Sequence, residues 1–200
     1  MRLSSFPYTV KLYAQHIGNG SVSLPNGSTT DLVLLREPIS QASYECDDGY
    51  EVTASNTTEA LLIDKTFYFI GPFLKSFYFA DYPLAKVRIG VKGDGTNEVH
   101  ITKVLLSIVA LSPSGSTSLG STTLTFSTEY SSKATDYKIF DVQALIPTTS
   151  QELPANVAIG YRIKIWGYVD GGDQYVKLFY TRGSSDTTVI INYMQEEEAP

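Results

Sequence analysis

The chain has 200 residues and carries 21 acidic against 15 basic side chains, a net charge of −6. This balance argues against a phosphate-binding surface, because neutralising phosphates dominates affinity for nucleic acids, so we expect no nucleic-acid partner. The single cysteine excludes an intrachain disulfide. No stretch reaches the ~20 apolar residues of a transmembrane helix, and the first 15 residues lack the apolar core of a secretory signal.

Residues 1–50 form the least regular part of the chain. Apolar and polar residues alternate over 8–13, which predicts a strand, and two Asn-Gly turn signals follow. The apolar run 31–37 could be a buried strand or one helical turn, since periodicity does not separate the two. We expect an arm or small subdomain that contacts neighbours, or equally a set of extra strands on the main sheet.

Short strands are predicted from residue 51 onward. Gly, Pro, Ser and Asn separate them at intervals of about 10 to 15 residues, a spacing typical of a β-sandwich or jelly roll. Before residue 150 the predicted strands are 59–64, 66–70, 74–80, 85–92, 98–111, 121–128 and 137–142.

Residues 153–193 are predicted to form a β-meander. Side chains alternate with a period of two over 161–169. The turn 170–173 contains two glycines, which accept positive φ without steric cost. Further strands are predicted at 175–181 and 187–193, joined by a second Gly-containing turn.

These patterns predict an all-β protein, an antiparallel β-sandwich of jelly-roll type with about eight to ten strands. No amphipathic segment of helical period separates the strands, which disfavours a parallel α/β fold. The sandwich is expected over 51–195, and 196–200 is expected to be an acidic, solvated tail.

The order of elements from residue 56 to 193 resembles a group of jelly-roll modules. The matching features are an aromatic strand, a Val-rich strand, a Ser-Pro-Ser-Gly turn and the closing meander: Phe77–Ala80, Val87, Ile89, Val91, Leu124–Ser127, Ile159–Ile163, Gly172–Asp173 and Lys177–Tyr180. Such modules occur in capsid, turret and decoration proteins of viruses and phages, in cell-surface proteins and in carbohydrate-binding modules. The resemblance implies a fold, and no binding residue of the group carries over to this chain.

Catalytic chemistry has few candidates in this sequence. Only His16 and His100 could act as a general base, and no Gly-x-Ser-x-Gly, His-x-x-x-His or phosphate-binding glycine loop occurs. We therefore expect an ordinary structural or exposed role for both histidines, no catalytic residues, no cofactor and no enzymatic activity.

The acidic residues of the closing meander suggest a calcium site. Asp170, Asp173 and Asp186 lie in adjacent predicted turns and could converge at one end of the sandwich. Calcium requires six to eight oxygen ligands, which turn carbonyls could complete. Ordinary Asp-Gly turn chemistry explains the same residues, and we adopt that interpretation.

Aromatic residues of the meander suggest a sugar-binding platform. Trp166, Tyr168, Tyr175 and Tyr180 lie on neighbouring predicted strands, where flat rings could stack on a sugar. Cross-strand aromatic pairs also stabilise sheets directly, and we favour that packing role.

Three sites fit the pattern for N-glycosylation. Asn19, Asn26 and Asn56 each begin an Asn-x-Ser/Thr triplet in a predicted loop, the position that acceptors require. In a chain this rich in Ser and Thr, chance matches to the triplet are common.

The sequence thus predicts a non-enzymatic virion structural protein: a capsid, turret, decoration or fibre subunit assembled in the host cytoplasm. Its partners would be copies of itself and other coat proteins, and possibly glycans. The alternative is a carbohydrate-binding module or cell-surface adhesion domain, which would be extracellular. A hydrolase on a jelly-roll scaffold would require paired carboxylates that the sequence does not place.

Overall fold

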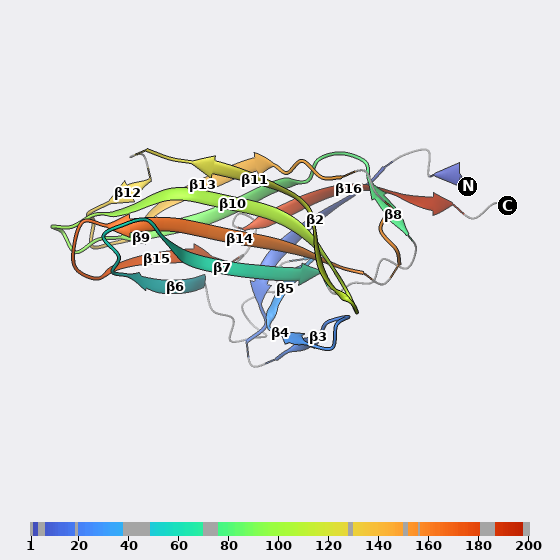
Figure 1. Ribbon diagram of the computed structural model, residues 1–200, viewed down its shortest axis with the longest axis horizontal. Coiled ribbons are helices and arrows are strands. Elements are labelled where there is room, and N and C mark those ends of the chain that lie inside the picture. The colour runs from blue at the N-terminus through green and yellow to red at the C-terminus, as the bar shows by residue number, and fades with distance from the viewer. Residues whose placement is uncertain are drawn as a thin grey trace.

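The computed structural model describes residues 2–3, 7–18, 20–37, 49–69, 76–127, 130–149, 152–155, 157–180 and 187–197 (Figure 1). Within these ranges every regular element is a β-strand, as the sequence predicts. The strands are β1 (Arg2–Leu3), β2 (Tyr8–His16), β3 (Val22–Ser23), β4 (Thr29–Thr30), β5 (Leu32–Leu35), β6 (Gly49–Ala54), β7 (Ala60–Phe69), β8 (Phe77–Phe79), β9 (Leu84–Lys92), β10 (Val99–Ser112), β11 (Gly115–Thr125), β12 (Ser131–Ser132), β13 (Lys138–Leu145), β14 (Ala158–Val169), β15 (Gln174–Phe179) and β16 (Thr188–Glu197).

Of the strands in the described ranges, fourteen belong to one large sheet. Its main path is β11-β10-β14-β7-β5-β2-β16-β9-β15-β6, while β1, β8, β12 and β13 pair at its sides, and β3 and β4 form a separate hairpin. β5 and β7 pair in parallel, and the other described pairs are antiparallel. The prediction of a mostly antiparallel all-β protein is therefore confirmed.

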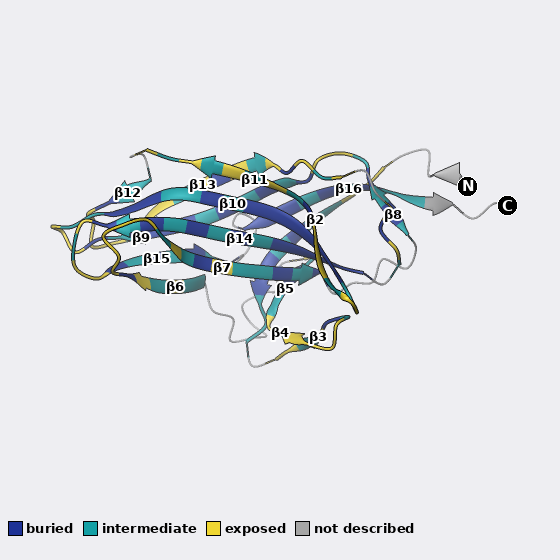
Figure 2. Cartoon of the chain, viewed as in Figure 1, coloured by how far each residue is buried: buried dark blue, intermediate teal, exposed yellow. Residues whose placement is uncertain are grey.

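The sheet curls so that its two ends face one another. β9 and β15 contact β10 without pairing to it. Tyr161 of β14 is fully buried and donates a hydrogen bond from Oη to the backbone carbonyl of Lys86 on β9, at 3.4 Å. One continuous core therefore lies between the two layers, and Figure 2 shows it as dark segments along β10, β14 and β9.

Period-two patterning explains which faces of the strands are buried. In β14 the apolar residues Ile163 and Ile165 are fully buried, whereas the alternating Arg162 and Lys164 are half-buried. The same alternation runs through β9 and β15. Burial of one face of each strand supplies most of the driving force for such a fold, at ~25 cal/mol per Å² of apolar surface.

The N-terminal segment joins the main sheet. β2 pairs with β16 on one side and with β5 on the other. The apolar run at 31–37, which the sequence left open between strand and helical turn, contains the strand β5.

The described residues form sixteen strands, more than the eight to ten predicted. Several of the additional strands have only two residues, for example β3, β4 and β12, whereas β8 lies within the strand predicted at 74–80. A segment of that length shows no measurable period, so only its pairing partner identifies it. Among the described residues, no helix is long and apolar enough to cross a membrane, in agreement with the sequence.

Candidate functional site

A histidine and two carboxylates meet where β10 begins and β14 ends. His100 Nε2 lies 3.1 Å from Asp170 Oδ1 and 3.7 Å from Glu98 Oε2. His100 is only 8% exposed. The side chains of Glu98 and Asp170 are 29% and 48% exposed. The imidazole of the cluster is therefore buried, while both carboxylates are in contact with solvent.

Strand register brings these three residues together. Val99 pairs with Val169, and His100 pairs with Tyr168. Glu98 and Asp170 therefore follow directly beyond the last pair, and the amide of Asp170 donates to the carbonyl of Glu98 at 3.0 Å. Alternate residues of a strand share a face, which aligns Glu98 with His100 on one strand and Tyr168 with Asp170 on the other.

An aromatic ring packs against one face of the His100 imidazole. Its ring stacks on that of Tyr168, with centroids 4.6 Å apart and planes inclined by 15°. On the opposing strand Gly167 leaves room for the backbone of His100, since a Cβ at position 167 would overlap the His100 carbonyl oxygen. Close strand approach and aromatic stacking together fix the orientation of the imidazole.

The neighbouring turn adds a further negative charge. Asp94 accepts hydrogen bonds from the backbone amides of Asn97 and Thr96, at 2.7 and 2.8 Å, and from Asn97 Nδ2 at 2.9 Å. These bonds, those from Asn97 foremost, hold the pKa of the Asp94 carboxyl far below its usual range. Asp94 is therefore ionised at neutral pH, a few residues before Glu98.

Unsatisfied polar atoms are concentrated at this end of the molecule. Among the described residues, two buried side-chain atoms lack a hydrogen-bond partner: His100 Nδ1 and Gln174 Oε1. Gln174 directly follows the 170–173 turn, and its Nε2 donates to the carbonyl of Gly171 at 3.1 Å. An unpaired buried polar group costs about 1–3 kcal/mol.

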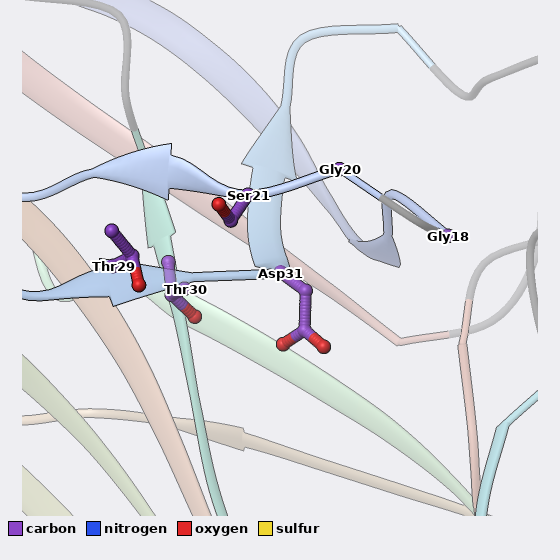
Figure 3. Close-up of a pocket in the computed structure, with 6 residues that line it drawn as sticks. All are labelled: Gly18, Gly20, Ser21, Thr29, Thr30 and Asp31. Carbon is purple, nitrogen blue, oxygen red and sulfur yellow. The ribbon is translucent and has the colours of Figure 1, made fainter.

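A second histidine–carboxylate pair lies beside a shallow pocket of about 400 Å³. His16 Nε2 lies 3.1 Å from Asp31 Oδ2 at the end of β2. Figure 3 shows Ser21 and Thr29 on facing segments at the β3–β4 hairpin, with Asp31 just beyond it. Hydroxyl, histidine and carboxylate groups are the components of a hydrolytic triad. Whether these groups could act as one depends on which partners the two nitrogens of His16 face.

Both nitrogens of His16 already have partners. The amide of Gly18 donates to Nδ1 at 3.3 Å, so Nε2 carries the proton that faces Asp31. A general base for a hydroxyl nucleophile must instead offer one free lone pair to that hydroxyl while the other nitrogen meets the acid. The nitrogens of His100 are no better placed: Nε2 faces carboxylates and Nδ1 is buried without a partner.

The predicted calcium residues are only partly assembled. Asp170 joins Glu98 and His100, whereas Asp173 is exposed in the same turn and is not part of that group. Asp186 lies outside the described residues. Sequence reasoning missed Glu98 as a partner, although its position two residues before His100 in a strand pattern was a usable signal.

The four aromatic residues of the predicted sugar-binding platform lie in different environments, some on half-buried strand faces and one in the core. Trp166 and Tyr168 lie on the half-buried face of β14, where Lys103 Nζ sits 4.6 Å from the Trp166 ring centroid. Tyr175 is on β15, with Lys92 Nζ 5.4 Å from its ring. Tyr180 is 4% exposed and packs edge-on against Phe67 in the core, so its face is closed to a ligand.

Two of the three glycosylation triplets lie in described loops. Asn26 and Asn56 are exposed. Asn26 Oδ1 accepts hydrogen bonds from the amide and the hydroxyl of Ser28, at 3.1 and 2.7 Å. Asn19 lies outside the described residues.

No protein-family model and no curated protein matches the sequence. Solved structures do match the fold. An α-amino acid ester hydrolase superposes with a TM-score of 0.56 and 9% identity, over 92% of this chain and 36% of its own. An aminopeptidase from a marine sediment archaeon of the Thaumarchaeota gives 0.54 and 9%, over 95% and 37%. A CocE/NonD family hydrolase from Staphylococcus aureus gives 0.56 and 12%, over 96% and 37%.

The chain has the fold of one part of these hydrolases. It spans little more than a third of their length. At such low identities the likeness establishes the fold alone. A structure of infectious bursal disease virus superposes with a TM-score of only 0.23, which is too low to indicate a shared fold.

These neighbours overturn the functional prediction made from the sequence. The expectation of a non-enzymatic virion structural protein is wrong, and so is its alternative of a carbohydrate-binding module or adhesion domain: the strong structural neighbours are hydrolases. The error has a physical origin. Period-two strands and tight turns are what any β-sandwich needs, so they do not distinguish a coat protein from the β-domain of an enzyme.

Proposed function

We propose that this chain is the β-sandwich part of a hydrolase that cleaves esters or amides of amino acids. The observation that carries this proposal is the superposition on the α-amino acid ester hydrolase, which extends over 92% of the chain with a TM-score of 0.56. An aminopeptidase and a CocE/NonD family hydrolase align over similar shares. As part of the same proposal, the two facing layers have the jelly-roll connectivity expected from the sequence.

In this proposal the chain contributes a rigid scaffold rather than the nucleophile. Neither His16 nor His100 is arranged to activate a hydroxyl in the described structure. The aligned hydrolases are also much longer than the matched region. The nucleophile and its base would therefore come from the rest of the enzyme, whether in the same polypeptide or in another.

A pull-down of hydrolytic activity tests this function. The tagged chain is expressed in its source cells, and washed beads are assayed with L-aminoacyl p-nitroanilides and with p-nitrophenyl esters of amino acids. We expect hydrolysis clearly above that of tag-only beads. A tagged Ile163→Asp variant is the matched control, because a charge at this fully buried position prevents folding. Activity no higher than on tag-only beads, with every substrate, would contradict the proposal.

A further inference from the structure

We infer that Glu98, His100 and Asp170 bind one divalent transition-metal ion, of which zinc fits the ligands best. One imidazole nitrogen and two carboxylate oxygens lie within 4.8 Å of one another. Histidine nitrogen and carboxylate oxygen are both ordinary zinc ligands, and a site with three protein ligands leaves a fourth position for water.

The distances between the ligand atoms fit a single ion. Bonds of about 2.1 Å from zinc to nitrogen and oxygen imply edges of about 3.4 Å between the ligand atoms of a tetrahedron. His100 Nε2 lies 3.1 Å from Asp170 Oδ1 and 3.7 Å from Glu98 Oε2, so the observed separations lie on either side of this value. These two edges lie within a few tenths of an ångström of the value for a tetrahedron, and the third edge, between the two carboxylate oxygens, is at most 4.8 Å.

Two backbone features organise the site before any ion binds. The Val99–Val169 pair places the two carboxylate-bearing residues opposite each other, and the hydrogen bond from the Asp170 amide to the Glu98 carbonyl fixes their spacing. Stacking on Tyr168 holds the imidazole of His100. Preorganised ligands lose little conformational entropy when the ion binds.

The charge of the cluster calls for a cation. In the part of the chain that the structure describes, the ion-pair partner of both Glu98 and Asp170 is His100, and neither carboxylate meets a lysine or arginine. The ionised Asp94 lies beside Gly172 of the 170–173 turn and brings a further negative charge to this end of the sheet. Two carboxylates and one imidazole at most partly neutralise each other, whereas a divalent ion offsets both carboxylates.

Two buried polar atoms at this end of the sheet lack a partner, although neither of them is a ligand of the proposed ion. His100 Nδ1 and Gln174 Oε1 are both buried without a partner, and both residues belong to this end of the sheet. Buried polar groups in folded proteins are nearly always satisfied, and a water molecule or an ion is one of the partners that can account for an exception. Half of the Asp170 side chain is exposed, so water can reach the site and complete the coordination sphere.

The imidazole ligand distinguishes this site from the calcium site considered in the sequence. Calcium takes six to eight oxygen ligands, whereas a nitrogen ligand favours zinc, iron, copper or nickel. Of the three aspartates, only Asp170 belongs to the cluster. The two hypotheses therefore predict opposite ion preferences.

Calorimetric titration of the metal-free full chain with zinc chloride is the direct test. It is done in a Cys46→Ser background, so that the single thiol cannot bind zinc. We expect one zinc ion per chain. His100→Gln, Glu98→Gln and Asp170→Asn should each weaken binding by at least about 100-fold, since loss even of outer-shell support costs 10–100-fold. Calcium chloride should bind more weakly than zinc.

His16→Gln is the matched control, because His16 is the only other histidine and also faces a carboxylate. It should bind zinc with unchanged affinity. The two carboxylate variants change partly exposed groups at strand ends and decide the outcome even if His100→Gln fails to fold, as circular dichroism would show. Failure to bind one zinc, or zinc affinity unchanged in both Glu98→Gln and Asp170→Asn, would overturn the inference. A preference for calcium would overturn the choice of ion.

Discussion

The hydroxyl of Tyr161 reaches across the interior and donates a hydrogen bond to the backbone carbonyl of Lys86, which joins the two layers of the sheet. Tyr161 is among the largest fully buried side chains of the described structure. The two residues are 75 positions apart in the chain. This contact makes Tyr161 a sensitive probe of whether the layers pack as the structure shows.

Truncating this side chain should strongly destabilise the protein. We expect Tyr161→Ala to lower the free energy of unfolding by about 3–5 kcal/mol through the cavity it leaves. Tyr161→Phe should cost about 1 kcal/mol, the worth of one hydrogen bond. Urea denaturation measures both. Tyr82, which is 48% exposed, provides the control: Tyr82→Ala should change stability by less than about 0.5 kcal/mol. Equal effects at both positions would contradict the two-layer core.

The loss of stability at alkaline pH should depend in part on the hydroxyl of Tyr161. Complete burial raises the pKa of its hydroxyl far above the usual 10.0. The folded state therefore keeps this proton while the unfolded state releases it, so the stabilisation is complete below pH 10.0 and is lost as the pH rises beyond it. Tyr161→Phe has no such proton and should lose stability less steeply above that pH, measured by urea midpoints. Parallel curves for the two proteins would exclude this role.

The Asp64–Arg162 pair should link stability to acid pH. Arg162 Nε and Nη2 donate to the two oxygens of Asp64, at 2.8 and 2.6 Å. Chiefly through these bonds, the pKa of Asp64 lies below its usual 3.8. The stabilisation is therefore present above pH 3.8 and is lost as the pH falls through the lower, folded-state pKa.

Asp64→Asn should therefore reduce stability by less than about 1 kcal/mol at neutral pH, a small amount because the pair is partly exposed. The difference from the wild type should shrink as the pH is lowered and also as salt is added. Urea midpoints at pH 7 and pH 3 measure both effects. A difference that grows towards low pH would have the wrong sign for this ion pair.

Replacing Gly167 by alanine should destabilise the protein, because β10 and β14 approach closely there, whereas replacing an exposed glycine should not. An added Cβ would overlap the carbonyl oxygen of His100, so Gly167→Ala should cost about 1–3 kcal/mol. Gly20 is exposed, and a Cβ there would meet only Ile17 at ordinary distances of 3.5–3.8 Å. Gly20→Ala should therefore be neutral or slightly stabilising. Thermal unfolding of the two variants compares them, and equal melting temperatures would show that β10 and β14 approach less closely at Gly167.

The sequence by itself determined the fold class and the faces of the long strands. Alternation over 161–169 identified which side chains of β14 enter the core, because the side-chain period of a strand is a local property. The glycines of the 170–173 turn were likewise visible in the sequence. The same local reasoning failed for function, since hydrolases of the solved structures share this fold and the strand patterns specify only the fold.

Only the tertiary structure decided which residues meet. Glu98 and His100 lie 70 or more positions before Asp170 in the chain, and the pairing of Val99 with Val169 brings the three side chains together. The period of a strand fixes the face on which a side chain lies but leaves both the partner strand and the register open. Those are set by how the whole core packs, because a slip of one residue would turn the apolar face of β14 to solvent.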